Sequence, residues 1–159
     1  MRPRMRNPTV VLSDAAQPLQ EILKAVHSAG VDIQTLELVH LRISQINGCA
    51  ADVDEGARTA REAGVSDQRL LALAAWRDTP YFTPAQRAAL ELAEAATRMA
   101  DRPDAVSDEI WDRAATHYDE TRLAAIVLMT GVTNLLNRLG ATTRQSPTPT
   151  TYTPGRNLP

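Results

Sequence analysis

Residues 37–52, ELVHLRISQINGCAAD, decide the fold prediction, because they combine a helix, its end and the only cysteine of the chain. Asn47 and Gly48 tolerate the left-handed backbone conformation and therefore predict the end of a helix. Cys49 then falls at or near the start of the next helix, where free backbone N–H groups and the helix dipole favour a thiolate. Glu37 lies on the preceding helix and can fold back towards the thiol. The stretch thus predicts a helical hairpin that brings a carboxylate and a thiol together.

This stretch closely resembles the core of the carboxymuconolactone decarboxylase / alkylhydroperoxidase D family, whose pattern reads roughly E-L-V-x-L-R-x-S-Q-x-N-G-C-x-x-C-x-x-x-H. The positions in register are Glu37, Arg42, Ser44, Gln45, Asn47, Gly48 and Cys49. The resemblance continues through residues 76–83 and 86–90 and ends at residues 134–138. It implies an all-α fold, the alkylhydroperoxidase D-like helical bundle, and a homo-oligomer that is a dimer, trimer or hexamer.

Two departures from the family pattern lie where its chemistry is expected. Asp52 occupies the position of the family's second cysteine, and Gly56 occupies that of its histidine. The resemblance implies a peroxide-reducing cycle in which two cysteines form a disulfide while the glutamate and the histidine relay protons. Asp52 cannot form a disulfide, and its carboxylate disfavours a thiolate at Cys49 by like-charge repulsion. The chain is therefore predicted to lack the two-cysteine cycle.

The predicted pocket is wider than in the family, because three positions carry small side chains. Ala51 stands where family members often have an aromatic residue, Gly56 replaces the histidine, and Leu136 stands where tryptophan is common. The lost volume predicts either a larger cavity or refilling by neighbours, since protein interiors do not tolerate large voids cheaply. The predicted pocket residues are His40, Ala51, Val53, Gly56 and Leu136.

Composition narrows the class of protein further. The 159 residues fit one domain, and 43% apolar residues are enough for a packed core. A net charge of -2 gives no electrostatic reason to expect nucleic acid or an anionic membrane as a partner, and no apolar run approaches the roughly 20 residues of a membrane helix. A single cysteine excludes an intramolecular disulfide and agrees with a reducing cytoplasm.

Helical periodicity and capping signals predict six or seven helices, and no alternating pattern argues for strands. The strongest local signal is Thr83-Pro84-Ala85-Gln86, which combines an N-cap, a proline at the first helical position and a capping box. The predicted helices cover about 13–28, 33–46, 49–64, 66–76, 83–100, 107–118 and 119–140. Residues 1–12 are predicted as an irregular arm, residues 13–140 as the helical domain and residues 141–159 as a Thr/Pro-rich tail.

We interpret the site as that of a cofactor-independent acid–base enzyme on a small organic substrate, catalysing a decarboxylation, an isomerisation or a lactone reaction. The resemblance implies that the fold can work without the cysteine pair, as in the family's decarboxylase branch. An apolar setting is expected to raise the pKa of Glu37 so that it acts as the acid, while Asp52 near a helix N-terminus stays ionised as the base. Cys49 is expected to line the pocket. No Cys/His spacing typical of zinc and no Gly-rich phosphate loop is present, so neither a metal nor a cofactor is expected.

Two alternatives remain open. The first is a single-cysteine peroxidase, in which Cys49 is oxidised to a sulfenic acid and rescued by an external thiol. The second is a non-catalytic oligomeric binding module with the same fold. An open pocket into which both Glu37 and Asp52 face favours an enzyme, whereas a collapsed apolar interior around Gly56 favours the module.

The sequence also predicts the partners or the exposure of four further residues. Arg42 is a candidate partner for Glu37 only through the tertiary fold, because i, i+5 positions on a helix do not face each other. His27 is expected at the surface. Asn134 and Asn137, near the end of the last helix, are expected to bond loop backbone.

Overall fold

The central helix, α3, is buried on most of its surface and organises the fold. In the computed structural model, which describes residues 2–100 and 102–147, it packs against three other helices. Their bounds are α3 (Ile33–Asn47), α4 (Ala50–Glu62), α6 (Pro84–Thr97) and α8 (Glu120–Thr143). Leu36, Leu38 and Val39 of α3 are each 0% exposed, so this helix supplies the centre of the hydrophobic core.

Every regular element in the described ranges is helical, which confirms the all-α prediction. The remaining elements are α1 (Pro8–Val11), the 3₁₀ helix η1 (Ser13–Ala15), α2 (Ala16–Ser28), α5 (Asp67–Ala72), the 3₁₀ helix η2 (Leu73–Asp78) and α7 (Asp108–Ala115). Over the described residues there are thus eight α-helices where six or seven were predicted. The count rises because α1, a helix of only four residues, forms within the predicted N-terminal arm.

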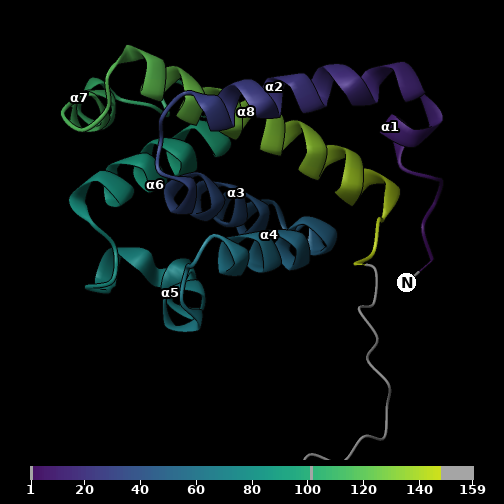
Figure 1. The fold of residues 1–159 in the computed structure, drawn as a ribbon, viewed down its shortest axis with the longest axis horizontal. Helices are drawn as coiled ribbons and strands as arrows, with labels where there is room; N and C mark the ends of the chain where they lie inside the picture. Colours follow the sequence, from purple (N-terminus) through teal and green to yellow (C-terminus); the bar gives the residue numbers. More distant parts are fainter. Residues whose placement is uncertain (1, 101, 148–159) are drawn as a thin grey trace, which may run out of the picture.

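The predicted hairpin of α3 and α4 is present, and the two helices run antiparallel side by side (Figure 1). Gly48 ends α3 with a left-handed φ of 65°, and its amide bonds to the carbonyls of Gln45 and Ser44. Cys49 follows as the N-cap of α4 in an extended conformation. The left-handed glycine therefore sets the reversal that returns α4 along α3.

The layers of the bundle define where a site can form. In Figure 1, α2 and α8 lie along the upper side of the view, α3 lies in the middle, and α4 and α5 lie below it. By length and composition alone α8 could cross a membrane, but 56% of its apolar window is buried inside the fold. α8 thus packs as a core helix of the bundle.

Three predicted boundaries are corrected by the structure. Within the predicted arm 1–12, Asn7 caps the short helix α1. Gly140 does not end the last helix, which continues to Thr143 and ends at Arg144 with a left-handed φ of 56°. The helix predicted through residue 76 changes to 3₁₀ geometry at Leu73, because Ala75 departs from helical angles. Most of the predicted tail, residues 148–159, lies outside the described residues.

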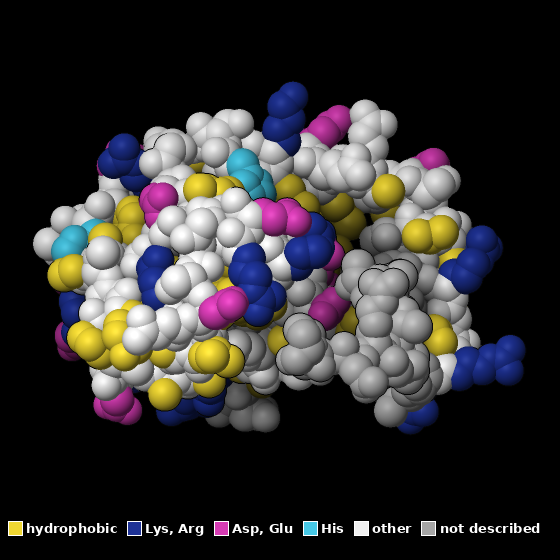
Figure 2. All heavy atoms as spheres, turned by 60° about the horizontal axis from the view of Figure 1, so that its bottom comes forward, with side chains coloured by type: hydrophobic (Ala, Val, Ile, Leu, Met, Phe, Trp, Pro, Cys, Tyr) yellow, Lys and Arg dark blue, Asp and Glu magenta, His cyan; other side chains and the backbone are white. Residues whose placement is uncertain are grey.

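Charged side chains of both signs are interspersed on the face shown in Figure 2. On α4, Arg58 pairs with Glu55 and Glu62, and Arg61 at its end pairs with Asp67 of α5. In these pairs the charges of the two signs lie beside one another.

Candidate active site

A pocket of about 260 Å³ opens between the α3–α4 hairpin and helices α2 and α8. Its walls combine apolar side chains from α2 and α8 with acidic and histidine side chains from α2, α3 and α4. The lining residues are Leu23, His27, Glu37, His40, Asp52, Glu55, Thr59, Met129, Val132, Thr133 and Leu136. Four of the predicted site residues, Glu37, His40, Asp52 and Leu136, therefore meet in one cavity.

Glu37 is the best-buried carboxylate of the pocket, at 8% exposure. The hydroxyl of Thr59 on α4 donates a hydrogen bond of 2.5 Å to Oε2 of Glu37. Two histidines approach the same carboxylate: Nε2 of His27 lies 3.8 Å from Oε1, and Nδ1 of His40 lies 3.9 Å from Oε2. Three helices thus converge on one carboxylate.

The predicted rise in the pKa of Glu37 is wrong. Burial alone raises the pKa of this carboxyl, as the prediction assumed, but His40, Thr59 and His27 together outweigh burial and hold it below its ordinary value. A donor and two imidazoles that carry positive charge when protonated favour the carboxylate form. The carboxylate form of Glu37 is therefore favoured over the protonated form that the prediction assumed.

His27 has a defined orientation, although it was expected simply at the surface. Its Nδ1 lies 2.7 Å from the carbonyl oxygen of Leu23, one turn earlier on α2. Because a carbonyl only accepts hydrogen bonds, Nδ1 carries the proton, and Nε2 is the ring atom that faces Glu37. His27 is half-open to solvent, with 38% of its side chain exposed, so it can exchange protons between Glu37 and water.

Gly56 does not line the pocket, because the ring of His40 fills the space beside it. A Cβ built on Gly56 would lie 3.4 Å from Nδ1 of His40 and 3.5 Å from its Cε1. The volume released at position 56 is thus refilled by a neighbour rather than left open, as dense packing requires. Gly56 serves the site by allowing His40 to approach Glu37.

Asp52 reaches the pocket from the first turn of α4 and is fixed by α8. Nδ2 of Asn137 donates a hydrogen bond of 2.6 Å to Oδ2 of Asp52 and lies 3.2 Å from the hydroxyl of Ser44. Asn47 in turn donates to the side-chain oxygens of Asn137 and Asn134. The two asparagines of α8 therefore bond side chains of the hairpin and not loop backbone, which corrects the prediction for them.

Cys49 does not line the pocket. It is 1% exposed, and a Cβ added to Gly140 of α8 would meet its sulfur at 2.8 Å. Burial raises the pKa of the Cys49 thiol, and the side chain of Asp52 adds to the rise, against the backbone N–H groups of Ala51 and Asp52. The prediction that Cys49 lines the pocket is wrong, since its side chain is buried in the interior and is absent from the lining. Ala51 and Val53 are also absent from the lining.

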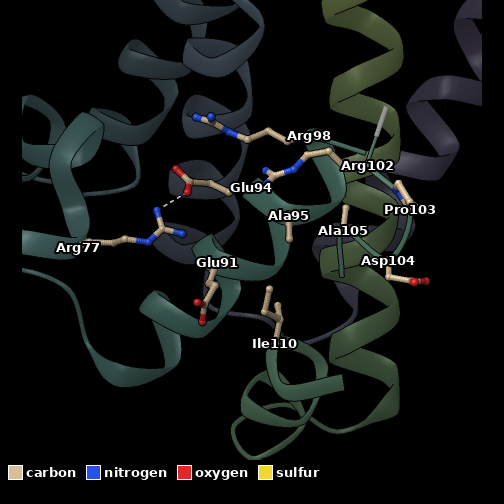
Figure 3. A pocket seen from close by; sticks show the side chains of 10 residues that line it. All are labelled: Arg77, Glu91, Glu94, Ala95, Arg98, Arg102, Pro103, Asp104, Ala105 and Ile110. Carbon is tan, nitrogen blue, oxygen red and sulfur yellow. Dashed lines mark hydrogen bonds and ion pairs between the residues drawn. The ribbon is translucent and has the colours of Figure 1, made fainter. Parts of the chain in front are cut away.

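Arg42 belongs to a different cluster, centred on the buried carboxylate of Glu94. Its Nε donates a hydrogen bond of 2.5 Å to Oε1 of Glu94, to which the indole nitrogen of Trp76 also donates, and Arg77 pairs with the other oxygen. Two members of this cluster, Arg77 and Glu94, point toward one another in a second pocket of about 320 Å³ (Figure 3). Arg42 is therefore unavailable as a partner for Glu37.

Sequence reasoning missed most of the residues that complete the first pocket: His27, Glu55, Thr59, Met129 and Thr133. Thr59 stands one turn after Glu55 on the α4 face that also bears Asp52, and that helical spacing is the one signal that could have found it. The same spacing could have found Glu55, whereas His27, Met129 and Thr133 depend on how α2 and α8 pack. Within the described ranges, no group of three or more His, Cys, Asp and Glu residues could hold a metal ion.

The helix order and the hairpin define an alkylhydroperoxidase D-like bundle, and comparisons with known proteins agree. A protein of unknown function from Agrobacterium tumefaciens, described as an AhpD-type antioxidant defence protein, superposes with a TM-score of 0.84 at 26% identity, over 92% of this chain and 99% of that one. The debrominase Bmp8 superposes with a TM-score of 0.77 at 19% identity, over 88% of this chain and 74% of that one, and this likeness concerns the fold alone.

The sequence comparisons identify the family. The profile of the Carboxymuconolactone decarboxylase family matches residues 13–95, more than half of the chain, which therefore belongs to this family. The uncharacterized protein YdfG of Bacillus subtilis is 34% identical over 121 residues, covering 76% of this chain and 81% of YdfG. The uncharacterized protein YnjA of Escherichia coli is 36% identical over 104 residues, covering 65% of this chain and only 56% of YnjA.

Proposed function

We propose that this protein is a cofactor-independent acid–base enzyme that acts on a small organic molecule. The observation that carries the proposal is the pocket itself, into which both Glu37 and Asp52 face beside two histidines. A collapsed apolar interior would favour a binding module, whereas this pocket holds a carboxylate at 8% exposure that Thr59 and two histidines keep in reach of a ligand.

Glu37 acts as the general base in this proposal. Its lowered pKa keeps it ionised, and the hydrogen bond from Thr59 fixes the orientation of the carboxylate. A substrate C–H or O–H group bound in the pocket gives its proton to Glu37. Positioned groups of this kind each contribute roughly 10²–10⁴-fold to the rate.

His27 and His40 carry the proton onward. Nε2 of His27 faces Glu37 at 3.8 Å and reaches solvent through its exposed edge, and the ring of His40 stands at 3.9 Å on the other oxygen. Either imidazole can return a proton to the substrate at a different atom, which turns abstraction into isomerisation or assists cleavage of a lactone or loss of carbon dioxide. Asp52, held by Asn137, presents a second carboxylate to the same substrate.

The pocket size supports a small substrate, since 260 Å³ lies below the roughly 300–1,000 Å³ of pockets for drug-sized ligands. The fold accommodates such molecules: a substituted form of the debrominase Bmp8, with a TM-score of 0.70 to this chain, has been solved in complex with 2,3,4-tribromopyrrole. A single-cysteine peroxidase is less consistent with this site, because Cys49 is buried below the pocket with a raised pKa.

A homo-oligomer and a cytoplasmic location are part of the same proposal. Three large apolar residues of α8 are exposed by 43–49% on the isolated chain: Val127, Leu128 and Leu135. A second copy of the chain would cover them, as the family resemblance implies. The free thiol of Cys49 agrees with a reducing compartment.

The test is a screen of small organic substrates followed by three substitutions on the substrate found. Glu37→Gln is expected to lower kcat by at least about 10²-fold and Asp52→Asn by less, while Cys49→Ala keeps most of the activity. Glu109→Gln on the exposed surface of α7 serves as the control, and thermal melts show that each variant is folded. Full activity in both Glu37→Gln and Asp52→Asn would contradict the acid–base proposal.

A further inference from the structure

Apart from two histidines, His27 and His40, the ionisable side chains that line the pocket are all acidic. Three carboxylates line it, those of Glu37, Asp52 and Glu55, whereas no Lys or Arg does among the residues the structure describes. Arg58, just outside the lining, pairs with Glu55 and offsets one of these charges. Asp52 is held by the neutral amide of Asn137, which leaves its negative charge uncompensated.

The opposite wall of the pocket is apolar. Leu23 comes from α2, and Met129, Val132 and Leu136 come from successive turns of α8. A ligand that fits both walls carries an apolar body and a positively charged group at one end. In a low-dielectric pocket, an unpaired negative charge attracts such a group far more strongly than it would in water.

We propose that the pocket selects a small protonated amine with an apolar body and rejects carboxylate anions. This rests on the proposed function, since it takes the pocket as the substrate site. The ammonium group lies beside Asp52 and Glu55, and the apolar body packs on Leu136 and Met129. Among the reactions open to the acid–base site, the charge pattern favours proton transfer and isomerisation on amines over decarboxylation, because a carboxylate substrate would meet three carboxylates and no Lys or Arg in the described lining.

The second pocket, in contrast to the first, has arginines in its lining. Arg77, Arg98 and Arg102 line the second pocket, where their side chains extend toward the side on which Glu94 lies (Figure 3). In that second pocket the three arginines are matched by Glu91, Glu94 and Asp104, whereas no arginine lines the first pocket among the described residues.

The first experiment measures the sign of the potential without any substrate. Leu136→Cys introduces a half-buried thiol into the pocket wall, and Leu71→Cys, at 85% exposure, is the matched surface control. Each variant is labelled with a cationic trimethylammonium and an anionic sulfonate methanethiosulfonate reagent. The cation-to-anion rate ratio is expected to be about tenfold higher at position 136 than at position 71, and to fall in the Asp52→Asn background and at high salt.

The second experiment measures binding of a matched ligand set. Benzylamine, benzyl alcohol and benzoate are titrated calorimetrically into the wild type and into Asp52→Asn. Benzylamine is expected to bind most tightly and to lose about tenfold in affinity in Asp52→Asn. The proposal is overturned if benzoate binds at least as tightly as benzylamine. It is also overturned if the cation-to-anion labelling ratios at the two cysteines are equal. If none of the three ligands binds, the labelling ratio alone decides. Neither readout requires turnover. The charge selectivity can therefore fail while Glu37 still proves essential for catalysis, and it can hold even if Glu37→Gln keeps full activity.

Discussion

Nδ2 of Asn137 on α8 donates a hydrogen bond of 2.6 Å to Oδ2 of Asp52. This bond joins α8 to the first turn of α4, the second helix of the hairpin. Asn137 is 0% exposed and also bonds Ser44 and Asn47 of α3. One amide therefore links three helices at the base of the pocket. Its loss leaves several buried polar groups without partners.

Asn137→Ala is expected to destabilise the protein by about 2–4 kcal/mol, because it removes bonds to a carboxylate and leaves buried donors and acceptors unpaired. The free energy of unfolding in urea measures this. In a double-mutant cycle with Asp52→Ala, the coupling is expected to be about 1–3 kcal/mol. Additive effects of the two substitutions would show that this hydrogen bond contributes little.

Gly140→Ala is expected to destabilise the protein by about 1–3 kcal/mol, since the new methyl group would lie 2.8 Å from the buried sulfur of Cys49. Gly131→Ala on the same helix is the matched control. Nothing lies within 4 Å of a Cβ at Gly131, so that substitution is expected to stabilise the helix by about 0.5–1 kcal/mol.

Cys49→Ala in the Gly140→Ala background tests the cause. Removing the sulfur is expected to recover most of the lost stability, as measured by the urea midpoint. If the double variant is no more stable than Gly140→Ala, the contact with the sulfur is not the source of the strain.

Local signals predicted the hairpin well, and tertiary contacts account for what they missed. Gly48 and the capping box at Thr83 each depend on residues adjacent in the chain, and both are present as predicted. His27 meets Glu37 only because α2 packs on α8, which in turn packs on α3. No local sequence pattern shows which faces of distant helices meet. The pKa of Glu37 was mispredicted because its burial was evident from an apolar helix face, whereas the groups that outweigh burial were not counted. The largest of them, His40, lies three residues further along α3, but Thr59 on α4 and His27 on α2 reach Glu37 only through the tertiary fold.

Arg42→Ala is expected to cost about 3–5 kcal/mol, because it breaks a buried ion pair and leaves Glu94, 5% exposed, with less compensation. Arg61→Ala is the matched control. Its pair with Asp67 is exposed, so its loss is expected to cost less than about 1 kcal/mol. Equal losses of unfolding free energy in the two variants would contradict a special role for the Glu94 cluster.

The lowered pKa of Glu37 makes a signed prediction about stability and pH. Its folded-state pKa lies below the ordinary value of 4.5, so the unfolded chain binds this proton more readily than the folded one. The resulting stabilisation is fully present above about pH 5 and is lost as the pH falls through 4.5 towards the folded pKa. The difference in unfolding free energy between the wild type and Glu37→Gln is therefore expected to be larger at about pH 6 than at about pH 3.5, as urea titrations at the two pH values can measure. A difference that grows as the pH falls would mean that burial dominates and that Glu37 is protonated more readily in the folded protein, which would make it an acid in this pocket and not its base.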